Sequence, residues 1–166
     1  MNSPIIRPFL LSILCSFTFL NSVSGLWSQS TSLWNPSIVA EQMKVKFESM
    51  YKGLEERPTV EETKMVAQMF TSVLENITTE NITKIAIIMI IFESMTMFAA
   101  FLMWNLDRRG FYLYLGAIAF CAFSSLIVVG GFLGLIMAVA GVFSSCFMAI
   151  LYALQLKKFP PLAPHA

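Results

Sequence analysis

The chain has 166 residues, of which 57% are hydrophobic and 13% are charged, and its formal net charge is +1. Soluble domains average roughly 45 to 50% apolar and about 25% charged residues, so this composition excludes an ordinary soluble domain and indicates an integral membrane protein. The low net charge and the scattered cations provide no basic surface. Nucleic-acid binding is therefore excluded as well.

Four apolar stretches, residues 9–27, 85–106, 111–129 and 132–156, can be recognised along the chain. Each is near the roughly 20 residues that a helix needs to cross about 30 Å of hydrocarbon. Only Gly130 and Gly131 separate the last two stretches, which predicts a tight hairpin of antiparallel helices. We predict an all-α membrane protein with four transmembrane helices. Its parts are a first span in residues 1–27, an outer segment at 28–84, three spans within 85–156 and a tail at 157–166.

The positions of the cations predict the orientation of these spans. Arg7 precedes the first span, Arg108 and Arg109 lie between the second and third, and Lys157 and Lys158 follow the last. With four spans, all three groups fall on one side of the membrane, which the positive-inside rule makes cytoplasmic. Both termini are then expected inside, and residues 28–84 outside.

The first span has an alternative explanation. A cation, an apolar core and small residues at positions 22–25 also describe a cleavable secretory signal peptide. Apolar character resumes at Leu26, however, and Trp27 and Trp34 suit an aromatic belt at the membrane interface. We predict that the span is retained; cleavage would leave three spans in the same orientation.

The outer segment is predicted to contain two amphipathic helices. Asn35 caps the first, whose first helical position is taken by Pro36, and Thr59 begins the second with Glu62 completing a capping box. Packing of their apolar stripes on each other and on the outer ends of the spans would form a small extracytoplasmic cap. The alternative is that they lie in the lipid surface or dock a partner. The stripes consist of Ile38, Val39, Met43, Phe47, Met50, Tyr51 and Leu54, and of Met65, Val66, Met69, Phe70, Val73 and Leu74.

Two N-glycosylation patterns begin at Asn76 and Asn81, just before the second span. Such patterns occur often by chance. Thr78 or Thr79 is equally well explained as the cap of a helix that continues into this span.

Glu93 is the only ionisable side chain in residues 85–106. A carboxylate near the membrane midplane costs about 3 kcal/mol on insertion scales, and no Lys, Arg or His lies within the apolar stretches to neutralise it. Thr18 and residues 121–125 are expected at the same depth. We therefore predict a protonated acid that hydrogen-bonds Ser124, Ser125, Thr18 or a backbone carbonyl. Three roles are open: a structural hydrogen bond between helices, a proton- or ion-handling site, and a contact with a partner subunit.

Small residues recur along the last span, at Gly130, Gly134, Ala138, Gly141 and Ser145. Such a stripe lets helix backbones approach closely in lipid. We expect the preceding helix to be its packing partner. A contact in a homo-oligomer or with a protein partner is the alternative.

The connection between the second and third spans carries residues typical of a membrane interface. Aromatic side chains are expected at headgroup level and arginines against anionic lipid, while Gly110 permits the chain reversal. The predicted anchors are Trp104, Arg108, Arg109, Tyr112 and Tyr114.

Residues 103–114, with the sequence MWNLDRRGFYLY, resemble the corresponding junction of small four-span inner-membrane proteins of Bacteroidota-type bacteria. Residues 7–10 and 21–26 are similar to the first span of those proteins. The resemblance implies a retained first span and a bacterial plasma membrane, but no particular activity. Asp107 departs from it, because a basic residue is expected at that position.

No motif of a hydrolase, metalloprotease or nucleotide-binding enzyme occurs, and Cys15, Cys121 and Cys146 all fall in apolar stretches. We therefore expect no enzyme, metal or cofactor. The first functional hypothesis is a structural or accessory subunit of a larger membrane assembly, which contacts membrane lipids and a partner through the small-residue stripe or the outer cap. The alternative is a small transporter or proton-linked module that uses the carboxyl of Glu93.

Overall fold

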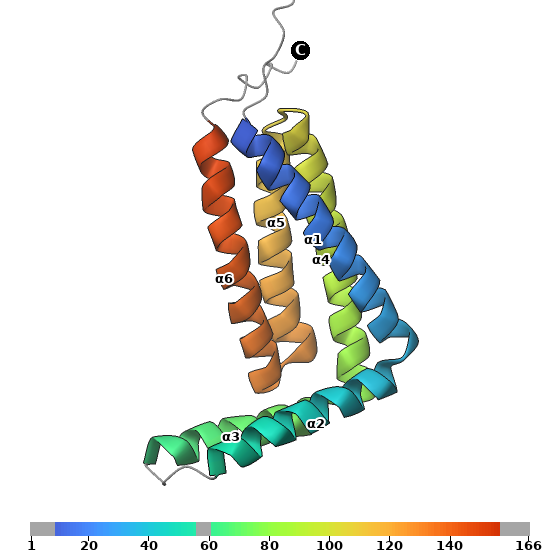
Figure 1. The fold of residues 1–166 in the computed structure, drawn as a ribbon, viewed down its shortest axis with the longest axis vertical. Helices are drawn as coiled ribbons and strands as arrows, with labels where there is room; N and C mark the ends of the chain where they lie inside the picture. Colours follow the sequence, from blue (N-terminus) through green and yellow to red (C-terminus); the bar gives the residue numbers. More distant parts are fainter. Residues whose placement is uncertain (1–8, 56–60, 157–166) are drawn as a thin grey trace, which may run out of the picture.

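The computed structural model describes residues 9–55 and 61–156. These ranges are almost entirely helical, and four long helices form a bundle with two others lying side by side across one end (Figure 1). The elements are α1 (Phe9–Trp34), α2 (Pro36–Glu55), α3 (Glu61–Asn76), α4 (Thr79–Trp104), α5 (Arg109–Ser124), the π-helical turn η1 (Ser125–Val129) and α6 (Gly131–Gln155).

Within the described ranges, four segments are long and apolar enough to cross a membrane: α1, α4, α5 continued by η1, and α6. The four predicted apolar helices are therefore present, as expected of a polytopic integral membrane protein. α1 continues to Trp34 rather than ending at Trp27. No proline interrupts it before Pro36, which instead takes the first position of α2, as predicted.

Successive long helices run in opposite directions (Figure 1). α1 begins, α4 ends and α6 ends at one end of the bundle, and α2 and α3 cross the other. The connections therefore alternate between the two ends in the predicted order.

Thr78 begins α4 as an N-cap: its hydroxyl accepts a hydrogen bond from the backbone N–H of Asn81 at 3.2 Å. The cap expected at Thr78 or Thr79 is thus confirmed. The two asparagine side chains of the glycosylation patterns also stabilise this turn. Asn81 Nδ2 donates to the Asn76 carbonyl at 2.8 Å, and Asn76 Nδ2 donates to the Ser72 carbonyl at 2.7 Å.

A tight turn precedes α5 and another follows η1, and each contains residues with a positive φ angle. Gly130 and Gly131 have φ of 65° and 57°, which confirms the predicted hairpin. At the α4–α5 turn, the left-handed residue is Leu106, with φ of 61°, and not Gly110. Gly110 serves a different purpose, because a Cβ there would lie 2.6 Å from the Ala99 carbonyl oxygen. It lets the start of α5 approach the end of α4.

Two hydrophobic clusters occupy the two ends of the bundle. We call the one at the start of α1 the terminal-side cluster, and the one beneath α2 and α3 the α2–α3 cluster. The buried members of the terminal-side cluster are Leu11, Leu14, Cys15, Ala99, Met103, Leu106, Tyr114, Ile118, Ala149 and Tyr152. Those of the α2–α3 cluster are Ala40, Val73, Ile77, Ile82, Ile88, Val129 and Leu133.

Part of the predicted α2 stripe packs against the α2–α3 cluster. Val39, Met43 and Phe47 make this contact, and the Phe47 ring also lies 5.9 Å from that of Phe70 in α3. Two other members of the stripe, Ile38 and Met50, are 53% and 55% exposed. The predicted capping box at Thr59 and the side chains of Leu54, Met65 and Val66 lie outside the described parts of the chain.

Candidate intramembrane site

Glu93 lies on α4 between the two hydrophobic clusters and is 6% exposed. Its carboxyl rests against α1 at Gly25, where a Cβ would lie 2.5 Å from Glu93 Oε1. A side chain at position 25 would displace the carboxyl. The absence of one therefore creates the space in which the acid sits.

The hydroxyls of Ser22 on α1 and Thr96 on α4 are the hydrogen-bonding neighbours of this carboxyl. They lie 3.0 Å from each other, and Thr96 Oγ1 also donates to the Glu93 backbone carbonyl at 3.0 Å. Each hydroxyl has a single proton to donate. Glu93 Oε2 is buried and has no hydrogen-bond partner among the described residues. The carboxyl is thus only partly satisfied.

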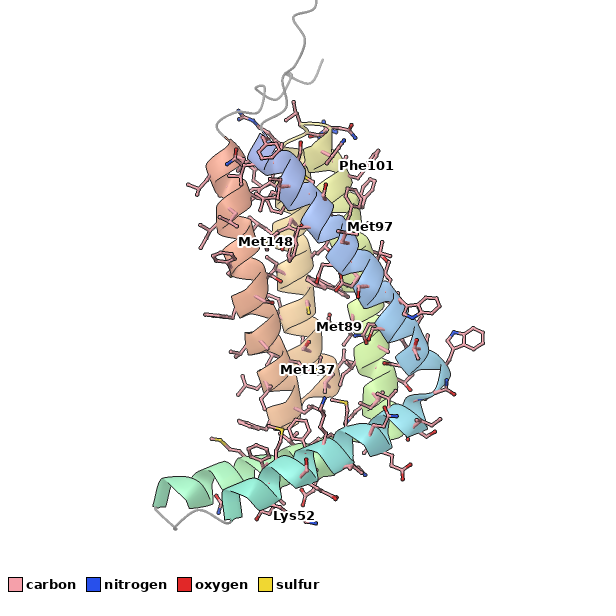
Figure 2. The ribbon with its side chains drawn as sticks, viewed as in Figure 1. Lys52, Met89, Met97, Phe101, Met137 and Met148 are labelled. Carbon is pink, nitrogen blue, oxygen red and sulfur yellow. The ribbon has the colours of Figure 1, made fainter. Side chains whose placement is uncertain are left out.

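A cavity of about 490 Å³ adjoins Glu93, with walls from α1, α4, α5 and α6. Three thioether side chains contribute to its walls, those of Met89 on α4 and of Met137 and Met148 on α6 (Figure 2). Its polar lining consists of Thr18, Asn21, Ser22, Glu93, Thr96, Tyr114, Cys121, Ser144 and Ser145. The concentration of hydroxyl groups around one acid distinguishes this region from the rest of the bundle.

The cavity opens sideways, between α1 and α6. Its exposed lining residues all belong to these two helices, whereas those on α4 and α5 are buried or half-buried. The exposed ones are Phe17, Asn21, Ile136, Ala140 and Ser144. α1 packs mainly on α4 and only weakly on α6, which is consistent with an opening at this seam.

A second polar group lies where the cavity meets the terminal-side cluster. The hydroxyls of Thr18 and Tyr152 are 2.7 Å apart, and Tyr152 makes an edge contact with Tyr114 at a ring-centroid distance of 5.5 Å. Tyr114 in turn hydrogen-bonds Ser145. These contacts link α1, α5 and α6 on the side of the cavity away from α2 and α3.

We expect Tyr152→Phe to lower the free energy of unfolding by about 1 kcal/mol, because a hydrogen bond between membrane helices contributes an amount of this order. The comparison is with Tyr112→Phe, since Tyr112 is 63% exposed. Unfolding in mixed micelles with increasing dodecyl sulfate gives the measurement. Equal stability of the two variants would show that the Thr18 to Tyr152 hydrogen bond contributes nothing.

The structure groups only some of the residues predicted to surround Glu93. Thr18 lines the same cavity, although its hydroxyl pairs with Tyr152. Ser124 and Ser125 do not line it, and Ser125 instead lies against Gly134 and hydrogen-bonds Cys121. The sequence predicts residues 121–125 of the third span at the depth of Glu93. In the structure α5 contributes Tyr114 and Cys121 to the cavity, so Ser124 and Ser125 lie beyond it along the helix.

Sequence reasoning missed several residues of the site. Four of them line the cavity, namely Asn21, Ser22, Thr96 and Ser144, and the fifth is Gly25, against which the Glu93 carboxyl rests. Only Thr96 has a clear signal, because it follows Glu93 by three positions and therefore shares its helix face. The residues on α1 and α6 come from helices distant in sequence. Their proximity to Glu93 depends on how the helices rotate about their own axes.

The predicted interfacial anchors occupy mixed positions. Arg109 and Tyr112 are exposed, and Trp104 and Arg108 are half-buried near the α4–α5 turn. Tyr114 departs from the prediction, because it is 4% exposed and its ring lies inside the bundle. It lies on the inner face of α5 with Ile118 and Cys121, as expected of residues four and seven positions apart.

The small-residue stripe of α6 faces α5 and η1, the packing partner expected from the sequence. A Cβ at Gly134 would lie 2.5 Å from the Ser125 carbonyl oxygen, and one at Gly141 would lie 3.7 Å from Cys121 Sγ. Ala138 and Ser145 are buried along the same face. Gly130 belongs to the hairpin turn instead.

These features define a class: a polytopic membrane protein with four long apolar helices and a polar cavity that opens at their side. No family model, curated protein or solved structure matches the chain.

Proposed function

We propose that this protein is a small, non-enzymatic, proton-linked transporter whose exchange site is the carboxyl of Glu93. One observation carries the proposal: a buried carboxyl oxygen that has no partner within the described part of the chain, beside a cavity with a polar lining. An acid that only joined two helices would be expected in a dry pocket with its oxygens satisfied. Glu93 instead adjoins a cavity, and its Oε2 has no hydrogen-bond partner among the described residues.

Charge balance explains why such a site would exchange a bound proton for another cation. A carboxylate inside the membrane is costly unless a proton or another cation neutralises it. The other titratable groups lining the cavity in the described structure are Tyr114 and Cys121 on α5, and neither supplies a positive charge at neutral pH. A proton and a cationic substrate would thus compete for Glu93.

In this proposal the protein lies in a bacterial plasma membrane. The positive-inside rule and the cations at Arg108 and Arg109 support a cytoplasmic α4–α5 turn, and the sequence resemblance supports the choice of membrane. α2 and α3 then form an extracytoplasmic cap over the ends of α4 and α6, which they contact.

Exposed apolar residues on α2 favour a second candidate function, an accessory subunit of a larger assembly. Ile38, Val45 and Met50 are each more than half exposed on this helix, and such residues at the water boundary suit contact with a partner. Purification from the native membrane in mild detergent distinguishes the two functions. A chain that is always recovered with a stoichiometric partner would favour the second.

Reaction with N,N′-dicyclohexylcarbodiimide, a hydrophobic reagent for protonated carboxyls, tests the proposed exchange site. In liposomes we expect one adduct, at Glu93, formed more slowly as the pH of the medium rises. This pH dependence is expected because a site that exchanges protons with water loses the reactive acid form at high pH. Intact-protein mass spectrometry measures the rate.

Glu93→Gln should abolish the adduct. Glu80→Gln should leave it unchanged, because Glu80 is an exposed residue that pairs with Lys84 at 2.6 Å. A rate of reaction at Glu93 that does not vary with pH, or the absence of reaction, would contradict the proposed exchange site.

A further inference from the structure

We infer that the cavity binds an amphipathic organic amine, which reaches Glu93 from the lipid through the opening between α1 and α6. The inference rests on the proposed function and adds the class of substrate and its route. Three features support it: the charge of the site, the composition of its walls, and the closure of both ends of the bundle.

The charge of the site selects a cation with an N–H group. Among residues 9–55 and 61–156, Glu93 Oε2 has no hydrogen-bond partner, and none of those that line the cavity is Lys, Arg or His. A protonated amine supplies both a positive charge and a hydrogen-bond donor, and charge-assisted hydrogen bonds to a carboxylate are strong. The neighbouring hydroxyls of Ser22 and Thr96 are available as further acceptors.

The walls suit an apolar body attached to that amine. Met89, Met137 and Met148 provide flexible, polarisable side chains that adapt to ligands of different shape. Phe17 and Phe92 provide aromatic surfaces, which also attract cations. A volume of about 490 Å³ lies within the range of sites that enclose a small organic molecule.

The route follows from where the bundle is closed. The terminal-side cluster packs at one end of the cavity, and the α2–α3 cluster packs at the other. The remaining opening is at the side, and Asn21 and Ser144 lie there near the middle of α1 and α6. Polar groups at this depth are unusual, since lipid tails offer them no hydrogen bonds. An amine head group passing through the opening would hydrogen-bond both residues.

Binding is a balanced proton transfer. The amine enters from the lipid in its neutral form and takes the proton of the Glu93 carboxyl, so the ammonium group and the carboxylate form as a pair inside the cavity. No bond within the ligand is broken. The net charge of the occupied site is zero before and after the transfer.

The test uses a matched pair of probes, N,N-dimethyl-4-phenylbutylamine and its uncharged carbon analogue 2-methyl-6-phenylhexane. A tertiary amine is chosen because it cannot form an amide with an activated carboxyl. We expect the amine to slow carbodiimide labelling of Glu93 at least tenfold at saturation, and the hydrocarbon to change it less than twofold. Equal effects of the two probes would overturn the assignment of an amine.

The same experiment separates the two proposals. If labelling depends on pH and the amine does not protect Glu93, the substrate class is wrong and the exchange site stands. If labelling is absent or independent of pH, the exchange site itself is wrong. Glu93→Gln provides a direct check, because equilibrium dialysis in detergent should show at least a tenfold loss of tritiated amine binding.

The route is tested at the opening with Ser144→Trp, which places a bulky ring between α1 and α6. Its control is Phe143→Trp, because Phe143 is 81% exposed and does not line the cavity. We expect Ser144→Trp to slow amine binding at least tenfold and Phe143→Trp to leave it unchanged. Circular dichroism and gel filtration verify that both variants fold. Unchanged binding kinetics in a folded Ser144→Trp variant would overturn the lateral route.

Discussion

Gly110→Ala is expected to lower the free energy of unfolding by about 3 kcal/mol, the upper part of the range for overpacking a tight interface. A Cβ at Gly110 would lie 2.6 Å from the Ala99 carbonyl oxygen and 2.8 Å from the Met103 amide nitrogen. Both are backbone atoms of α4, so rotation of a side chain cannot relieve the contact. The start of α5 would have to move away from α4.

Gly116→Ala is the matched control for this substitution. It lies on the same helix, and a Cβ there meets nothing within 4 Å. Alanine is a better helix former than glycine by about 1 kcal/mol, so this variant should be as stable as the wild type or slightly more so. Dodecyl sulfate titration in mixed micelles, followed by circular dichroism, measures both. Similar stability of the two variants would contradict the close approach of α5 to α4.

Gly134→Ala is expected to cost about 2 kcal/mol by the same mechanism at the α6 interface. The added Cβ would lie 2.5 Å from the Ser125 carbonyl oxygen, at the first residue of the π-helical turn η1. This carbonyl also accepts a hydrogen bond from the Gly130 amide at 3.3 Å. Displacing it would disturb both the turn and the hairpin that follows.

Gly141→Ala tests the same small-residue stripe without the clash. A Cβ there makes an ordinary contact at 3.7 Å with Cys121 Sγ, so we expect no loss of stability. The titration used for Gly110 applies here. A loss in Gly141→Ala equal to that in Gly134→Ala would show that the entire stripe requires glycine, for instance at an oligomer contact.

The positions of the spans and turns could be predicted from the sequence because they depend on local features. Long apolar stretches, the cap at Thr78 and the glycine pair at Gly130 each determine nearby backbone. The first span is predicted to end at Trp27 because the apolar stretch ends there. The helix continues until Pro36, since tryptophan does not interrupt a helix.

The candidate site was predictable only in part. Glu93 attracts attention because an acid within an apolar span is costly. Thr18, which was expected at the same depth, lines the same cavity, but its hydroxyl pairs with Tyr152 and not with Glu93. Tyr114 was expected at the interface because tyrosine is common there, but its helix face turns it toward Ser145. The sequence predicts the depth of a residue in the membrane. The direction in which its side chain points from the helix axis follows only from how the helices pack.

The junction between α1 and α2 has a mechanical consequence. α1 forms one side of the cavity opening, ends at Trp34, and is joined to α2 through Asn35 alone. The Asn35 amide bonds the Thr31 carbonyl at 3.1 Å, and its own carbonyl accepts from the Val39 amide at 3.2 Å, so the joint is held on both sides. A tilt of α1 that widened the opening between α1 and α6 would therefore be transmitted to α2. Such a tilt would move α2, and α3 packed against it, across the end of the bundle.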